Sequence, residues 1–160
     1  MAVLVLLGIA STMVVSNFNA VGVFSANASD DLVSSIGSIQ SAYNSYQQDK
    51  SAVPTGLADS SFIPQYLFIP RPATGFDGTY GISGYVLAYM TGQASPNNGT
   101  YVCARANVNG NDSTFQAITK AAAKLSADKF FYNTSCPATA NMTTPAGAAT
   151  VYVTSWITRN

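Results

Sequence analysis

Histidine and glutamate are both absent from this chain of 160 residues, and only 9% of its residues are charged, against about 25% in ordinary soluble proteins. Without histidine the chain lacks the usual general base near neutral pH, the Ser-His-Asp and Cys-His nucleophile systems, and histidine ligands for zinc. The seven acidic residues are all aspartate, and nothing in their spacing indicates a catalytic pair. The sequence also has no GxGxxG, GxxxxGKS/T or CxxCH motif. We therefore expect no enzymatic activity, no metal site and no cofactor.

The chain also carries no net charge. Seven basic and seven acidic residues give a formal net charge of +0. The basic surface typical of nucleic-acid binding is therefore lacking, and we expect no specific nucleic-acid partner. Polarity comes from Ser, Thr, Asn and Gln, and because little net charge opposes association, the composition favours an extracellular, self-associating protein.

The first 15 residues, MAVLVLLGIASTMVV, carry no charge, and the first ionisable side chain is Asp30. A secretory signal is one interpretation, since residues 26–28 fit an A-x-A cleavage pattern, but no Lys or Arg precedes the apolar run. A transmembrane anchor is the second. The uncharged apolar run to Val15 is shorter than the ~20 residues that span a bilayer, and the extension to Phe24 includes two asparagines. The third is a helix held in a membrane before assembly and then buried among copies of itself.

The apolar segment continues into an amphipathic helix, whose apolar residues recur at spacings of 4, 3, 4 and 3: Leu32, Ile36, Ile39, Tyr43 and Tyr46. Pro54 and Gly56 predict that the helix ends near Lys50. A continuous helix of ~50 residues would be about 75 Å long at ~1.5 Å per residue. We expect its N-terminal half to project from the remaining domain.

The rest of the sequence predicts a small antiparallel sheet with one further helix. Residues 51–82 form a loop with a short strand at Tyr66–Ile69, and residues 83–92 and 99–108 form a hairpin. A helix follows, capped by Asp112 or Ser113, with Lys120, Lys124 and Lys129 on a solvated face rather than a DNA-binding one. Its inward stripe is Phe115, Ile118, Ala122, Leu125 and Phe130. A strand at 149–159 with one buried face closes an α+β fold, in which the antiparallel sheet lies on the long helix.

Cys103 and Cys136 lie 33 residues apart and form no CxxC motif. We predict a disulfide, with two buried free thiols as the alternative. In the chain-entropy model, a loop of this size gives about 3–4 kcal/mol of stabilisation. Trp156, the one tryptophan, is expected in the core or at a subunit contact.

A hydrophobic helix that continues into an amphipathic one, followed by a loop, an antiparallel sheet and a C-terminal cysteine pair, resembles a type IV pilin. A starting Met1 and a helix between the two cysteines are similar to the type IVb subclass. The resemblance implies that a peptidase removes a short basic leader, that the amine of Met1 is methylated, and that subunits polymerise into an extracellular filament with the help of membrane assembly machinery. The implied filament-core residues are Val3, Leu4, Val5, Leu6, Leu7, Ile9, Met13, Val14, Val15 and Phe18, and the stripe from Leu32 to Tyr46 is implied to pack the helix on the head.

One position departs from that family. Its members usually carry Glu at the fifth mature position, where this chain has Val5. Minor pilins, secretion pseudopilins and archaeal pilins can lack that carboxylate, so these remain alternatives to a major pilin. A membrane-tethered extracellular binding domain is a further alternative.

We divide the chain into a projecting helix at 1–28 and a head at 29–160. N-x-S/T sequons occur at Asn27 and at four candidate glycosylation sites, Asn98, Asn111, Asn133 and Asn141.

Overall fold

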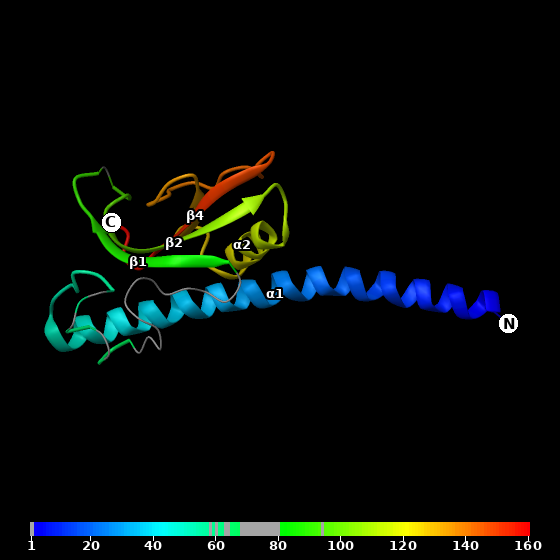
Figure 1. The fold of residues 1–160 in the computed structure, drawn as a ribbon. Helices are drawn as coiled ribbons and strands as arrows, with labels where there is room; N and C mark the ends of the chain where they lie inside the picture. Colours follow the sequence, from blue (N-terminus) through cyan, green and yellow to red (C-terminus); the bar gives the residue numbers. More distant parts are fainter. Residues whose placement is uncertain (1, 58, 60, 63–64, 68–80, 94) are drawn as a thin grey trace.

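The computed structural model describes residues 2–57, 59, 61–62, 65–67, 81–93 and 95–160, and it describes side chains from residue 22 onward. The chain forms a long helix followed by a four-stranded antiparallel sheet and a second, short helix (Figure 1). The elements are α1 (Ala2–Lys50), β1 (Ile82–Met90), β2 (Gly99–Asn109), α2 (Ser113–Lys124), β3 (Phe130–Asn133) and β4 (Ala148–Trp156). The predicted α+β fold is confirmed.

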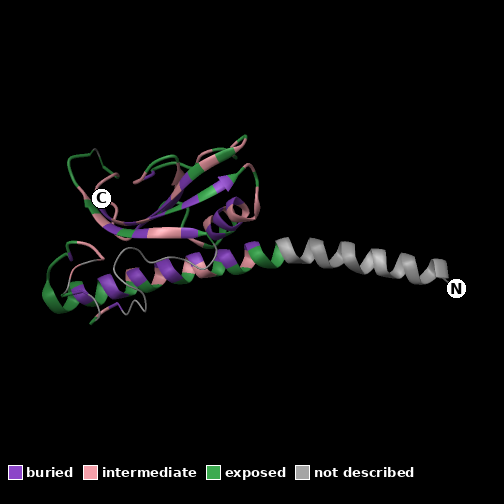
Figure 2. Ribbon diagram, in the orientation of Figure 1, coloured by how far each residue is buried: buried purple, intermediate pink, exposed green. Residues whose placement is uncertain are grey.

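Helix α1 packs one face against the rest of the molecule. The predicted apolar stripe lies on that face, and all five of its side chains are at most 7% exposed: Leu32, Ile36, Ile39, Tyr43 and Tyr46. Figure 2 shows buried and exposed residues alternating along this part of α1, as the helical period requires. The helix ends after Lys50, where Ser51 adopts a φ of 51° and donates its backbone N–H to the carbonyl of Gln47 at 2.9 Å.

The strands lie in the order β1-β2-β4-β3, and each neighbouring pair is antiparallel. The predicted β1–β2 hairpin is confirmed, with Leu87 opposite Val102. In the adjoining pair, Ala104 lies opposite Val153. Alternate residues of β1, β2 and β4 are buried in one core with α1 and α2. Figure 1 shows β1 running along α1, with α2 nearer to the N-terminus of α1 than the sheet centre is.

Helix α2 begins as predicted, because the Asp112 carboxylate accepts the backbone N–H of Phe115 at 2.8 Å and thereby caps the helix. The prediction that Phe130 extends the helical stripe is wrong, since α2 ends at Lys124 and Phe130 begins β3. Phe130 pairs with Ser155 of β4. Tertiary pairing with a distant strand thus overrides a helical spacing that ran past the true end of the helix.

The closing strand β4 differs from its prediction in how many of its faces are buried. Val151 and Val153 point into the main core as expected, but Thr154 and Trp156 on the opposite face are also 0% exposed. The prediction of one buried face is therefore wrong for the C-terminal half of β4. Phe131 and Ala138 cover the outer face there and form a second, smaller core with Trp156.

The predicted strand at Tyr66–Ile69 is wrong at its described end, where Tyr66 lies in a turn and Leu67 in irregular chain, while positions 68 and 69 lie outside the described residues. Tyr66 and Phe62 instead pack around Tyr46 near the C-terminal end of α1, with ring centroids 5.2 and 5.6 Å from the Tyr46 ring. Aromatic contacts rather than sheet pairing hold this loop against α1.

Candidate assembly helix and disulfide region

Polar contacts fix the register of α1 against the head. The hydroxyl of Tyr43 lies 3.2 Å from that of Thr100, and the Nε2 of Gln40 donates to the hydroxyl of Ser155 at 3.0 Å. Tyr46 makes a third such contact, 2.9 Å from the hydroxyl of Ser61. Because each bond needs one particular side chain to face one particular strand or loop, α1 cannot slide or rotate without losing them. The predicted packing residues of the helix are therefore held in one register against the head.

Small side chains line the N-terminal limit of the α1–head contact. Ser25, Ala28 and Ser29 are at most 1% exposed, and Ala117 and Ala121 of α2 are 0% exposed. With so little side-chain volume between them, the two helices approach closely where α2 crosses α1.

Two lysines of α2 add polar contacts at the same place. Nζ of Lys120 donates to Oγ of Ser25 at 2.5 Å, and Nζ of Lys124 lies 2.6 Å from a carboxylate oxygen of Asp30. The predicted solvent-facing lysines are indeed exposed, and two of them also bridge to α1, which the sequence did not indicate.

Apolar side chains of α1 are exposed immediately before Ser25. Val23 is 55% and Phe24 37% exposed. Met1 and the predicted filament-core residues, from Val3 to Phe18, lie outside the residues whose side chains are described. The division of the chain at residue 28 stays a prediction. The residues that the structure describes include no helical segment with the length and hydropathy of a membrane span.

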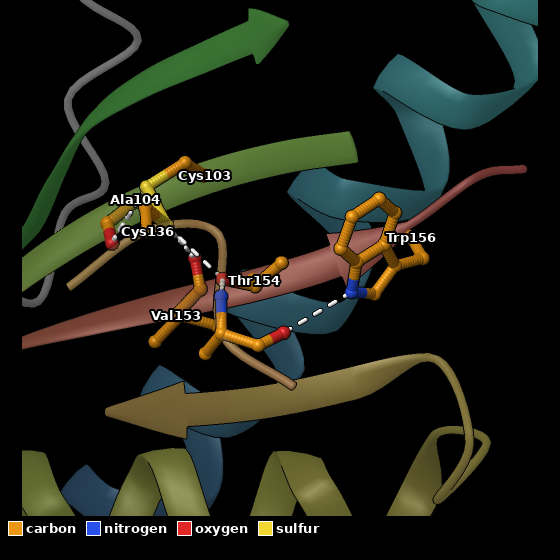
Figure 3. The surroundings of a disulfide bond; sticks show 7 residues. Cys103, Ala104, Cys136, Val153, Thr154 and Trp156 are labelled. Carbon is orange, nitrogen blue, oxygen red and sulfur yellow. Dashed lines mark hydrogen bonds between the residues drawn. A yellow bond between two sulfur atoms is a disulfide. The ribbon is translucent and has the colours of Figure 1, made fainter. Parts of the chain in front are cut away.

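The predicted disulfide is confirmed. Cys103 on β2 and Cys136 in the loop after β3 are joined, with their Cα atoms 6.3 Å apart. Figure 3 shows the bridge beside Thr154, whose hydroxyl lies 3.1 Å from the Cys136 sulfur and accepts the backbone N–H of Ala138 at 2.8 Å. Since disulfides persist in oxidising compartments, the bridge indicates an extracytoplasmic location.

Trp156 anchors the same loop from the other side. Its indole Nε1–H donates to the Ala138 carbonyl at 3.1 Å (Figure 3), and it is completely buried. Trp156 thus belongs to the core within the subunit.

Arg159 lies over the Phe131 ring, 4.7 Å from its centroid, and donates to the Pro96 carbonyl at 3.0 Å. The sequence did not indicate this role of Arg159, because its hydrogen-bond partners lie far away in the chain.

The described sequons differ in how their amides are engaged. Both amide atoms of Asn98 bond to the backbone of Gln93, and Asn133 donates its amide to the Ala140 carbonyl. Asn141 is exposed and accepts the Tyr132 N–H through its oxygen. Asn111 and Asn27 are exposed as well. Glycosylation at any of them stays a prediction.

No group of three or more Cys and Asp side chains that could hold a metal ion occurs in the part of the chain that the structure describes. Among the described residues, Asp59 has a lowered pKa, because its carboxylate accepts hydrogen bonds from Ser61 and Thr55 that lower the pKa to about 2. These bonds stay within one exposed turn and cap it. Asp59 thus has a structural role in the loop.

Comparison with protein-family models, with curated proteins and with solved structures gives no match for this chain. The architecture itself carries the likeness. A long N-terminal helix packed against a four-stranded antiparallel sheet with a disulfide in the C-terminal region is consistent with a pilin-like fold.

Proposed function

We propose that this chain is a structural subunit of an extracellular filament of the type IV pilin kind, which polymerises through its N-terminal hydrophobic helix. Before assembly the same helix holds the subunit in a membrane, where assembly machinery collects it. The protein acts by self-association and carries out no catalysis. Adhesion, motility or DNA uptake are the kinds of activity that such a filament supports.

The observation that carries this proposal is the uneven coverage of α1. From Ser25 to Tyr46 one face of the helix is buried under the head, whereas Val23 and Phe24 are exposed. The sequence before them remains almost wholly apolar back to Met1. Apolar side chains that stay exposed at the end of such a sequence need another apolar environment, and we assign this role to lipid before assembly and to neighbouring copies afterwards.

The energy available from such burial is large. At ~25 cal/mol per Å² of apolar surface, burying most of residues 1–24 would contribute tens of kcal/mol before entropy is subtracted. The low charge of the chain, with a formal net charge of +0, leaves little electrostatic repulsion between copies. A filament held by these helices needs no covalent links between its subunits.

Electron microscopy of sheared cell-surface material tests the proposal. We expect thin helical filaments that contain this chain. Leu7→Asp, which places a charge in the assembly helix, should abolish them, while Ser41→Asp on the exposed side of α1 in the head should leave them intact. Membrane-bound monomer without filaments in the unmodified protein would contradict the proposal.

Val5 favours a second candidate, a minor pilin or a secretion pseudopilin. The stoichiometry of purified filaments separates the two, because a minor subunit occurs at a few copies per filament and a major one forms its whole length. A membrane-tethered binding domain is distinguished by deletion of residues 1–24, which would leave the activity of a tethered domain intact and would abolish that of a filament subunit.

A further inference from the structure

Near the N-terminal limit of the contact between α1 and α2, a lysine lies beside the end of the apolar segment. Ser25 is the first completely buried residue after the exposed pair Val23 and Phe24, and the ammonium of Lys120 donates to its hydroxyl at 2.5 Å. The cation of Lys120 is therefore held within one residue of the point where the apolar sequence gives way to the head.

Lys120 differs from the neighbouring lysine in its charge balance. The Lys124 ammonium forms an ion pair with the Asp30 carboxylate at 2.6 Å, and among the described residues no other ion pair occurs. Asp30 is five residues beyond Ser25, about 8 Å farther along α1 at ~1.5 Å per residue. Asp112 is engaged as the cap of α2 through the Phe115 N–H. Within the described part of the chain, no carboxylate pairs with Lys120 to balance its positive charge.

We propose that, in the membrane-held subunit, Lys120 binds the phosphates of anionic lipid headgroups and so seats the head on the membrane surface. This proposal rests on the proposed function, which places residues 1–24 in the bilayer. A bilayer that covers Phe24 brings its headgroups to the level of Ser25, and that is where the structure holds the Lys120 ammonium. A lysine stem packs along apolar surface while its head stays in water, as is typical at membrane interfaces.

One lysine at this level is enough for a measurable preference of the subunit for anionic over neutral membranes. Attraction of a single lysine to an anionic membrane surface changes an equilibrium by about fivefold and disappears beyond a Debye length. Lys50, the last residue of α1, is exposed and 25 residues beyond Ser25, about 38 Å away at ~1.5 Å per residue. Lys50 is therefore a matched control on the same subunit.

Site-resolved acetylation of lysines by a water-soluble ester, read by mass spectrometry, tests the contact. The full chain is inserted in vesicles of phosphatidylcholine alone and in vesicles that also contain phosphatidylglycerol. We expect Lys120 to react about threefold to fivefold more slowly in the anionic vesicles, and high salt to remove the difference. Lys50 should react equally in both.

Lipid retention provides the variant test. Native mass spectrometry of the chain released from mixed vesicles should show phosphatidylglycerol retained over phosphatidylcholine, and Lys120→Gln should reduce that preference while Lys50→Gln leaves it unchanged. Equal labelling of Lys120 in both vesicles overturns the proposal. Protection by inorganic phosphate in phosphatidylcholine vesicles also overturns it, because it assigns the lysine to free anions. A chain that floats with neither vesicle refutes the membrane stage itself, and this proposal with it.

Discussion

At the scale of single residues, the outer face of β4 depends on a few groups brought together from distant parts of the chain. Thr154 and Trp156 of β4 both bond to the short segment from Cys136 to Ala138. This segment helps to bury the outer face of the C-terminal half of β4, where the sequence predicted one buried face. The two bonds to Ala138 and the disulfide are the contacts whose loss should be most visible.

Loss of the disulfide should destabilise the head. Replacing Cys103 and Cys136 together by serine is expected to lower the free energy of unfolding by about 3–4 kcal/mol, because the unfolded chain regains the entropy of a 33-residue loop. Denaturant unfolding measures the change, with Thr134→Ser in the same loop as the control. An equal stability of the serine variant and the control would contradict this account.

Trp156→Phe tests the indole contact. The variant keeps an aromatic ring but leaves the buried Ala138 carbonyl without its donor, and we expect a loss of about 1–3 kcal/mol in the free energy of unfolding. Tyr89→Phe, at a side chain that is 59% exposed, should change it by less than about 0.5 kcal/mol. If both variants unfold at the same denaturant concentration, the indole hydrogen bond does not contribute to stability and this prediction is wrong.

The lowered pKa of Asp59 predicts that the stability of its loop depends on pH. Bonds from Ser61 and Thr55 lower its pKa to about 2, below the ~3.9 of an unfolded aspartate. The ionised form is therefore favoured by folding, so its contribution is complete above about pH 4 and lost as the pH falls through about 2. Amide exchange of Ser61, corrected for intrinsic rates, should lose protection across that range. Asp59→Asn should remove the dependence and Asp128→Asn should not.

At the scale of elements, local patterns predicted α1 and α2 well. The stripe from Leu32 to Tyr46 repeats within one helix, so its burial follows from spacing alone. Asp112 likewise caps α2 from its own sequence neighbourhood. Strand β3 was missed because its four residues gain their conformation from pairing with residues of β4 that lie 19 to 25 positions away. The role of Arg159 was missed for a similar reason, since its hydrogen-bond partners are distant in the chain.

Helix α1 should be energetically part of the head. Ile39→Ala, at a side chain that is 0% exposed, should lower the free energy of unfolding by about 2–5 kcal/mol, because it removes a buried side chain from the contact between the helix and the sheet. Val53→Ala, at a side chain that is 43% exposed, should cost less than about 0.5 kcal/mol. Denaturant unfolding of the two variants, with unchanged dependence on denaturant, checks this prediction.

At the scale of the whole molecule, one helix has two tasks in the proposed function. Its C-terminal part, from Ser25 to Tyr46, contributes a buried face to the head, and its apolar N-terminal part is assigned to the membrane and then to the filament. The disulfide and the Trp156 contacts stiffen the opposite side of the sheet. A rigid head on a single long helix is suited to repeated, identical contacts between copies.

The most direct measurement of this account is cryo-electron microscopy of filaments at a resolution that shows side chains. We predict that residues 3–18 lie at the filament centre, packed against the same segment of neighbouring copies, with the sheet and the Cys103–Cys136 bridge outside. A filament in which residues 3–18 face solvent, or in which subunits are joined through their sheets while this segment takes no part, would contradict the account.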